Sequence, residues 1–552
     1  MADATYDAVV IGGGNKALMT ALYLQKYGNM KTAVFERKHE IGGCMASDES
    51  GVPGFIHDQH ATDIGDFYYK IIEDDFPQFK ERGFEWVPYE IPGGGIFEED
   101  QSSYLISSPF TDPEHEITAE SFARFSRRDA DTWLKLWDMW SKKGGRDAFM
   151  RYLHNPPPPN PDEPDIFEAF LMGSKELREL GFDRGWFMRT AIQVMSDLFE
   201  SDPLVTGLTR IAHSWITVPS DIVGGGLNFL FTLLGLTGFG GSKGGTHSIA
   251  HAAYKCFIEE GGKSFTEHEV KKVLIENGKA KGVELSDGTQ IEARKLVVSG
   301  LGPYQLVFEL TGEEHWPWRI LRRVKNLSYW YSGGVSWYTW CVHEPPDYLA
   351  AKDNPDLPKV GWLTLGSMDP WSMPLSHYYK RLGQQCPDMD MVIVNQVHGD
   401  KTRVPEGKWS FLAEDYSGGP PLGLYQRSDK WWRDYKKEHM EAQLKHMRKF
   451  APNMTWDNVI GCSPHHDFDE TRMLTLYNGC WSGVDQNPTQ LGRNRPIPEL
   501  ARHKTTIEGL YATGVAWHYG GMCSASQGYN CYKIIAEDFG LPLPPKSKDR
   551  GY

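Results

Sequence analysis

The first part of the chain alternates between two apolar runs and an amphipathic stretch that separates them. Residues 7–11 are almost entirely apolar, residues 15–27 carry apolar side chains at helical spacing, and residues 31–36 form a second apolar run. Two apolar strands joined by an amphipathic helix are typical of a β-α-β unit, in which the strands lie parallel. The pattern therefore predicts an α/β fold with a parallel sheet.

Similar patterns recur in two later parts of the chain. After residue 240 a helix is predicted, and the sequences ENGK and SDGT that follow it mark tight turns between short strands. Residues 507–514 then predict a strand, and residues 528–540 predict a helix that ends at Gly540. We expect the strands of both later parts to belong to the same sheet as the two strands of the first part.

The longest apolar run with almost no charge extends from Leu227 to Phe239. Its 13 residues are fewer than the roughly 20 that a membrane-spanning helix needs, so we exclude a transmembrane helix here. Two interpretations stay open. The run forms a helix in the protein core, or it forms an apolar surface that walls a substrate channel or touches a membrane from one side.

Composition and charge restrict the partners and the compartment. The 73 acidic and 58 basic side chains give a formal net charge of -15, so we expect no nucleic-acid partner. The eight cysteines include no CxxC pair, and no signal-peptide pattern precedes the first strand, so we expect a cytoplasmic protein. Peripheral membrane association and oligomer formation stay open.

The turn after the first strand carries a dinucleotide-binding pattern. Gly12 and Gly14 stand at the first two glycine positions of G-x-G-x-x-G/A, and Ala17 stands at the third. Gly12 permits the tight turn, Gly14 lets the backbone approach a pyrophosphate, and the helix N-terminus then faces the anion. Glu36, at the end of the second strand, is placed to bind ribose hydroxyl groups. This unit alone suits either FAD or NAD.

Two segments after this unit resemble FAD enzymes. In ERKHEIGG, Gly42 and Gly43 follow Glu36 as in the E-R-x-x-x-x-G-G pattern of FAD enzymes related to amine oxidases. The segment GFIHDQHATDI is similar to one in phytoene desaturases and related carotenoid oxidoreductases. The resemblance implies an FAD cofactor, with the extra glycines in a loop that wraps it.

The resemblance to this family continues into the later parts of the chain. The segment around Val270 resembles the family's second nucleotide segment, where a residue at this position touches the adenine end of FAD. GLYATGVAWHYGGMCSASQGYN resembles the C-terminal signature, in which Gly514 would meet the pyrophosphate and the turn at 520–522 would face the flavin ring. The cofactor-binding residues that the pattern and the resemblance imply are Gly12, Gly14, Asn15, Lys16, Ala17, Glu36, Arg37, Gly42, Gly43, Val270, Gly514, Gly521 and Met522.

The resemblance also implies the architecture. A Rossmann-like FAD-binding domain would be discontinuous and would comprise residues 1–65, 240–305 and 500–552. An inserted α+β substrate-binding domain with a helical part would comprise residues 66–239 and 306–499. The similarity is weakest within that inserted domain, so the sequence leaves the identity of the substrate open.

Four residues are candidates for proton transfer beside the flavin. His518 and Tyr519 lie in the C-terminal signature, which the resemblance places next to the flavin ring, and a histidine can titrate near neutral pH. Asp58 and His60 lie where this chain departs from the family by adding histidines. Histidine pairs of this kind can imitate a metal site. Their spacing in the sequence does not place them in a common coordination geometry, so we expect no metal.

The leading hypothesis is an FAD-dependent oxidoreductase of the dehydrogenase or desaturase type. It would act on CH–CH or allylic C–H bonds of an apolar unsaturated substrate, such as a carotenoid, another isoprenoid or a cyclic terpene-like compound, by hydride transfer to flavin N5. An external acceptor (a quinone, oxygen or an electron-transfer protein) would reoxidise the flavin, and apolar side chains would wall the site. Two alternatives stay open: a flavin-dependent, redox-neutral isomerase or hydratase, and a non-enzymatic, lipid-carrying escort protein.

Overall fold

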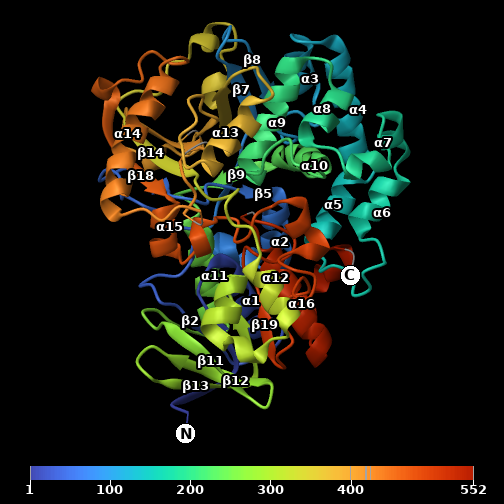
Figure 1. The fold of residues 1–552 in the computed structure, drawn as a ribbon, viewed down its shortest axis with the longest axis vertical. Helices are drawn as coiled ribbons and strands as arrows, with labels where there is room; N and C mark the ends of the chain where they lie inside the picture. Colours follow the sequence, from blue (N-terminus) through green and yellow to red (C-terminus); the bar gives the residue numbers. More distant parts are fainter. Residues whose placement is uncertain (1, 398, 417–418, 423, 522, 551–552) are drawn as a thin grey trace.

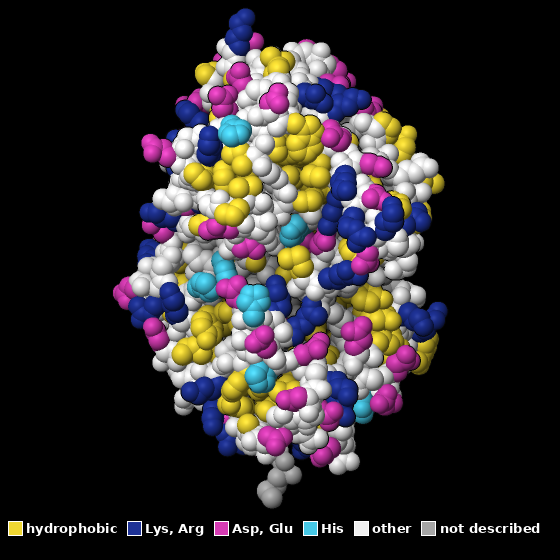
Figure 2. Space-filling view, turned by 90° about the vertical axis from the view of Figure 1, so that its left-hand side faces the viewer, with side chains coloured by type: hydrophobic (Ala, Val, Ile, Leu, Met, Phe, Trp, Pro, Cys, Tyr) yellow, Lys and Arg dark blue, Asp and Glu magenta, His cyan; other side chains and the backbone are white. Residues whose placement is uncertain are grey.

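A computed structural model describes residues 2–397, 399–416, 419–422, 424–521 and 523–550 of the 552 residues. The described residues form two lobes that lie one above the other along the longest axis of the molecule (Figure 1). The lower lobe holds the sheet that contains the N-terminal strand, and the upper lobe holds a second sheet flanked by helices. On the face drawn in Figure 2, acidic and basic side chains are interspersed, with apolar groups between them.

The lower sheet is the expected parallel sheet with an antiparallel extension. Its order is β10-β2-β1-β13-β12-β11, and β19 pairs with β13. Strands β10, β2, β1, β13 and β19 run parallel, whereas β12 is antiparallel to both of its neighbours. The strand bounds are β1 Ala4–Ile11, β2 Thr32–Phe35, β10 Lys263–Phe265, β11 Val270–Glu276, β12 Lys279–Leu285, β13 Gln290–Ser299 and β19 Leu510–Ala512.

Three helices pack together in the lower lobe, with α1 (Asn15–Lys26) in contact with both α11 (His247–Glu259) and α16 (Ser526–Phe539). The predicted β-α-β unit is therefore confirmed, since β1, α1 and β2 follow one another and the two strands pair in parallel. The predicted turns at ENGK and SDGT connect β11 to β12 and β12 to β13. The prediction that Gly540 ends the last long helix is also confirmed, because Gly540 caps α16 at φ 63°.

The upper sheet mixes strands from the first and second halves of the chain. Its order is β18-β14-β17-β16-β15-β7-β8, and every pair is antiparallel except β15 with β7. The bounds are β7 Gly93–Phe97, β8 Ser103–Ile106, β14 Ser336–Val342, β15 Trp362–Gly366, β16 Met391–Val394, β17 Trp409–Asp415 and β18 Val459–His466. Two smaller sheets join β3 (Ser47–Asp48) to β4 (His57–Asp58), and β9 (Phe239–Ser242) to β5 (Ile64–Gly65) and β6 (Trp86–Pro88).

Helices cover the upper sheet, with α3 to α10 gathered on one side and α14 on the other (Figure 1). Helix α13 lies against α9, since Nε2 of His377 is 2.8 Å from Nε2 of His213. Their bounds are α3 Glu116–Ala123, α4 Arg127–Lys142, α5 Gly145–Leu153, α6 Ile166–Gly173, α7 Lys175–Glu179, α8 Ala191–Leu198, α9 Asp202–Ile216, α10 Gly226–Leu236, α13 Ser372–Arg381 and α14 Asp429–Met447. The remaining α-helices are α2 Asp66–Asp75, α12 Trp318–Lys325 and α15 Asp467–Leu474.

Helix α10 accounts for most of the apolar run between Leu227 and Phe239. Most of its side chains are buried, and the helix packs against α8 and α9. The interpretation of this run as a core helix is therefore confirmed over that of an exposed membrane-binding surface. Throughout the part of the chain that the structure describes, every helix is too short or too polar to cross a bilayer.

Parts of the segment that the sequence assigns to the substrate domain pack on the lower sheet. Leu306, Ile320, Val484 and Ile497 share one apolar cluster with Val9 of β1. The lower lobe thus extends beyond residue 305, because these side chains cover the outer face of its parallel strands. The predicted fold class, a Rossmann-like α/β unit with a second lobe of helices and sheet, is confirmed.

Candidate functional site

A cavity of about 210 Å³ lies where the glycine loops of the lower lobe meet the upper sheet. One part of its wall is formed by lower-lobe residues: Gly14, Asn15, Lys16, Ala17, Gly42, Gly43, Cys44, Met45, Gly300, Gly514, Val515, Gly521 and Cys523. The opposing wall is mainly aromatic and aliphatic: Trp215, Trp337, Trp362, Tyr416, Leu474, Leu476 and Trp481. Among the described lining residues, Lys16 is the only lysine or arginine, so the walls beyond the glycine loops are largely apolar.

Three glycine turns meet at the start of α1. Gly12 (φ 87°), Gly43 (φ 63°) and Gly514 (φ 121°) adopt left-handed backbone conformations, which glycine tolerates best. The first two turns are joined directly, because the backbone N–H of Gly42 donates to the carbonyl oxygen of Gly13 at 2.9 Å. The glycines that the sequence singles out therefore come together from three distant parts of the chain.

Gly14 precedes α1 and leaves open space beside its backbone. Its φ of -62° is an ordinary value, and a Cβ atom added there would have no described protein atom within 4 Å. No described side chain caps the N-terminal amides of α1. The backbone N–H of Asn15 donates to the carbonyl oxygen of Gly42 at 3.3 Å, whereas the next two amides, of Lys16 and Ala17, have no such partner among the described residues. Amides of this kind at a helix N-terminus favour an anionic group, so this part of the cavity suits a phosphate-bearing ligand.

Glu36 supports the glycine turn from the end of β2. Its carboxylate accepts a hydrogen bond from the backbone N–H of Gly13 at 2.6 Å. Glu36 is absent from the cavity lining, so its contact with a ribose stays a prediction. Arg37 is exposed and donates to the backbone oxygen of Arg472 at 2.8 Å, and Val270 is buried at the start of β11. The proposed cofactor contacts of these two residues also stay predictions.

The predicted cofactor residues at the start of α1 all line the cavity. They are Asn15, Lys16 and Ala17. The side-chain oxygen of Asn15 accepts a hydrogen bond from the Tyr68 hydroxyl at 2.5 Å, which fixes its orientation. Burial lowers the pKa of Lys16, whose ammonium group therefore gains from an anionic partner. Met522 lies outside the described residues.

The two catalytic candidates in the C-terminal signature are packed away from the described cavity lining. Nε2 of His518 lies 3.1 Å from the backbone oxygen of Tyr152, and burial lowers the pKa of this imidazole to about 4. The ring of Tyr519 packs edge-on against Phe149 and Tyr152, and burial raises the pKa of its hydroxyl. The described geometry therefore gives both residues a packing role.

Asp58 is also held away from the cavity lining. One carboxylate oxygen pairs with the Arg403 guanidinium at 2.8 Å, and both side chains are buried. The other oxygen accepts hydrogen bonds from the backbone N–H and the hydroxyl of Thr246, at 2.8 and 2.9 Å. Asp58 thus ties β4 to the segment before α11, and its carboxylate is fully engaged in structural contacts.

Among the four catalytic candidates, His60 lines the cavity. Its Nε2 lies 2.6 Å from the carboxylate of Glu470, and its Nδ1 is buried without a hydrogen-bond partner among the described residues. Burial raises the pKa of Glu470, although the neighbouring His60 opposes this shift. His465 Nδ1 lies 3.9 Å from the same carboxylate, and burial lowers the pKa of His465 to about 4. Glu470 therefore orients an imidazole that can exchange a proton at the cavity.

Two buried acids in the cavity lining are not predicted from the sequence. Asp63 accepts a hydrogen bond from Trp362 Nε1 at 2.5 Å, and Glu414 accepts one from the Tyr416 hydroxyl. Burial raises the pKa of Asp63 well above its usual range and the pKa of Glu414 to about 8. Carboxyl groups whose pKa is raised beside a cavity are candidates for proton transfer. Asp63 stands in the GFIHDQHATDI segment, but no motif marks Glu414 on β17.

Replacing Glu414 with glutamine is expected to make the free energy of unfolding less dependent on pH. The folded-state pKa of about 8 lies above the ordinary value of 4.5. The protonated carboxyl group therefore contributes its full stabilisation below pH 4.5, and this contribution is lost as the pH rises toward 8. Glutamine cannot ionise, so Glu414→Gln should gain on the order of 3–4 kcal/mol relative to the wild type between pH 5 and pH 8.

Urea unfolding of both proteins at the two pH values measures this difference. Glu406→Gln is a matched control, since Glu406 is exposed and its substitution should leave the pH dependence unchanged. Parallel pH profiles for the wild type and Glu414→Gln would show that the Glu414 carboxyl is not held protonated by burial.

A family model and several curated relatives match the sequence. The model for an NAD(P)-binding Rossmann-like domain matches residues 10–71. Pyridine nucleotide-disulfide oxidoreductase domain-containing protein 2 of Mus musculus is 25% identical, and the match covers 97% of this chain and 94% of the relative. A limonene dehydrogenase subunit of Castellaniella defragrans is 24% identical over 97% of this chain and 95% of that protein.

A solved structure of similar fold is putrescine oxidase bound to putrescine. It has a TM-score of 0.58 and 12% sequence identity to this chain, and the match covers 97% of this chain and 99% of that one. The likeness thus includes the upper lobe, which the family model for the nucleotide-binding domain leaves out. The fold is that of a Rossmann-like nucleotide-binding domain joined to a second domain, as in the putrescine oxidase structure.

Proposed function

We propose that this chain is an FAD-dependent oxidoreductase of the dehydrogenase or desaturase type that acts on an apolar unsaturated compound, such as a carotenoid, another isoprenoid or a cyclic terpene-like molecule. The observation that carries the proposal is the cavity, in which glycine loops suited to a pyrophosphate open directly onto aromatic and aliphatic walls. The limonene dehydrogenase relative, similar over nearly the whole chain, supports a terpene-like substrate.

The residues at the glycine turns fit FAD. The space beside Gly14 and the amides of Lys16 and Ala17 at the start of α1 would hold the pyrophosphate. The turns at Gly43 and Gly514 approach the same space without side chains. Lys16 would add a positive charge there. When bound, FAD would supply a hydride acceptor, so that a C–H bond of the substrate can be oxidised. The apolar walls would exclude water and orient the substrate.

We assign proton transfer to His60. Converting a CH–CH unit to a C=C bond removes one hydride and one proton from adjacent carbons, so the proton needs an acceptor at the cavity. His60 lines the cavity, and Glu470 at 2.6 Å stabilises the imidazolium that forms. Asp63 and Glu414 lie in the same lining as buried acids and would complete a route for protons.

Replacing His60 with glutamine is expected to slow substrate oxidation by about 10²-fold, because general acid–base groups contribute about 10²–10⁴-fold. FAD content should stay unchanged, since His60 is not in the glycine turns. Stopped-flow measurement of anaerobic flavin reduction gives the rate. His465→Gln is the matched control, because it removes a neighbouring imidazole that is absent from the cavity lining. An unchanged rate in His60→Gln would exclude His60 as the proton acceptor.

The proposed reaction is tested by mixing the FAD-loaded protein with a panel of apolar unsaturated compounds without oxygen. Stoichiometric bleaching of the flavin by one compound, with formation of the dehydrogenated product, supports a dehydrogenase or desaturase. Conversion of a compound without net flavin reduction would favour a redox-neutral isomerase or hydratase. After anaerobic reduction, adding a quinone, oxygen or an electron-transfer protein identifies the electron acceptor, which we propose to be external.

A further inference from the structure

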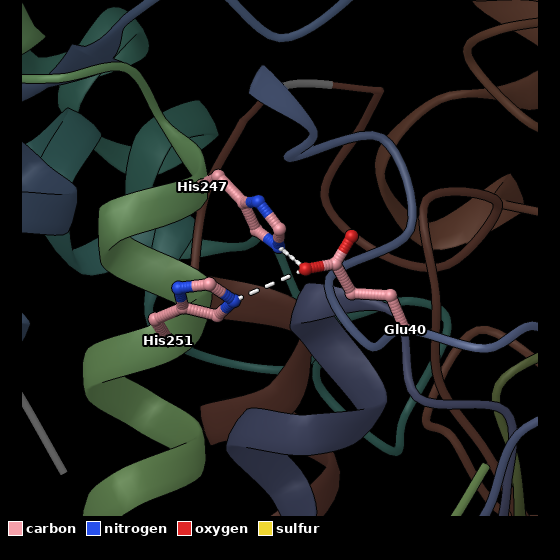
Figure 3. A group of neighbouring side chains, drawn as sticks. All are labelled: Glu40, His247 and His251. Atoms are coloured by element: carbon pink, nitrogen blue, oxygen red, sulfur yellow. Dashed lines mark hydrogen bonds and ion pairs between the residues drawn. The ribbon is translucent and has the colours of Figure 1, made fainter. Parts of the chain in front are cut away.

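A second polar cluster lies on the loop after β2, outside the cavity lining. It consists of Glu40 on that loop and of His247 and His251 on α11 (Figure 3). Both histidine rings point toward one carboxylate oxygen of Glu40, and each Nε2 lies 3.2 Å from this atom. The three atoms that could ligate a metal lie within 4.8 Å of one another.

We propose that Glu40, His247 and His251 form a binding site for one divalent transition-metal ion, of which Zn²⁺ is the representative. Histidines four residues apart project from the same face of a helix, and imidazole with carboxylate is a ligand set that suits Zn²⁺, Cu²⁺ and Ni²⁺. Tetrahedral coordination with bonds of about 2.0–2.1 Å places neighbouring ligand atoms about 3.3 Å apart. The observed 3.2 Å separations from Glu40 match this spacing.

The surroundings of the three side chains also suit an ion. Nε2 of His247 is shielded from solvent and makes no hydrogen bond with any described residue, which leaves a buried ring nitrogen without a hydrogen-bond partner. The His251 side chain is 46% exposed, so water can reach the cluster and complete the coordination.

The cluster of His60, His465 and Glu470 is a less suitable ion site. Nε2 of His60 lies only 2.6 Å from the Glu470 carboxylate, which is a hydrogen-bond distance and leaves no room for an ion between them. His465 is 3.9 Å from the same carboxylate. That cluster therefore supports proton transfer, whereas the cluster at Glu40 has the spacing of ligands.

An ion at Glu40 would connect the loop after β2 to α11. Gly42 follows in this loop, and a Cβ atom there would lie 3.1 Å from Ala250 on α11, so the loop already packs closely on the helix. Because the ion binds the folded chain, it should raise the melting temperature. The same loop carries Glu36, so the ion would also slow the loss of FAD; this last consequence rests on the proposed function.

Isothermal titration of the full chain with ZnCl₂, in a buffer with a reducing agent, tests the site. The expected result is one Zn²⁺ per chain and a rise in melting temperature. Glu40→Gln and His251→Gln should each weaken this binding at least about tenfold, because even indirect partners of a metal ligand contribute about 10–100-fold. Both positions are partly exposed, so these variants should fold.

Two control variants make the result specific. His39→Gln changes an exposed histidine next to Glu40, and His465→Gln changes the other cluster; both should bind Zn²⁺ as the wild type does. Three results would each overturn the proposal. They are no Zn²⁺ binding to the wild type, binding to Glu40→Gln and His251→Gln as strong as to the wild type, and loss of binding only in His465→Gln. The titration is done without FAD, so it measures Zn²⁺ binding even if the proposed flavin function is wrong.

Discussion

Replacing Gly14 with valine is expected to remove bound FAD from a chain that still folds. At this position the backbone φ of -62° is acceptable for valine, and the new Cβ atom would have no neighbouring atom within 4 Å among the described residues. It would instead occupy the space at the N-terminus of α1 where the pyrophosphate is proposed to lie. The fraction of chains that retain FAD should fall at least about tenfold, equivalent to about 1.4 kcal/mol or more of binding free energy.

The flavin absorbance per chain after desalting measures this loss, and the melting temperature of the FAD-free protein reports on the fold. Gly173→Val is the matched control, because Gly173 also has no neighbouring atom within 4 Å of an added Cβ but lies at the exposed end of α6. Retention of FAD by folded Gly14→Val would show that the pyrophosphate does not occupy the space beside α1.

Asp58→Asn is expected to lower the free energy of unfolding by about 3–5 kcal/mol, the usual cost of removing one partner of a buried ion pair. The substitution leaves the Arg403 guanidinium buried without its carboxylate. It also weakens the contact between β4 and Thr246, since a neutral amide accepts hydrogen bonds less strongly than a carboxylate. Urea unfolding of the variant and the wild type at pH 7 measures the change.

A double variant shows whether the loss comes from the ion pair. Asp58→Asn with Arg403→Met removes both charges and should recover part of the lost stability, because no buried charge is then left unpaired. Asp131→Asn, at an exposed position, is the control for the substitution itself. A change of less than about 0.5 kcal/mol in Asp58→Asn would contradict the structural role of Asp58, since surface substitutions have effects of that size.

The nucleotide-binding half of the fold was predictable because its signals are local. The apolar strands, the turn at Gly12 and the helix that follows occupy one short stretch, and strand pairing in a β-α-β unit follows from their order. The same holds for the ENGK and SDGT turns and for the cap at Gly540. In each case adjacent residues determine the backbone conformation, so the sequence pattern carries the information.

The proposed catalytic side chains were less predictable because their partners are distant in the sequence. His60 meets Glu470, and Asp58 meets Arg403 across 345 residues, so neither the proposed proton-transfer pair nor the buried ion pair follows from local spacing. His518 lies in the expected signature turn, yet its ring faces the backbone of Tyr152. Burial, which raises the pKa of Glu414, is likewise a property of the assembled lobes.

The central claim is that the glycine turns hold FAD, whereas the family model matched at residues 10–71 is named for NAD(P). The most direct measurement is reconstitution of the full chain with FAD, NAD⁺ or NADP⁺ in parallel, followed by desalting and quantification of the retained cofactor. We expect about one FAD per chain, with a protein-bound flavin spectrum, and no retained nicotinamide. Retention of NAD⁺ or NADP⁺ with no retained FAD would contradict the central claim.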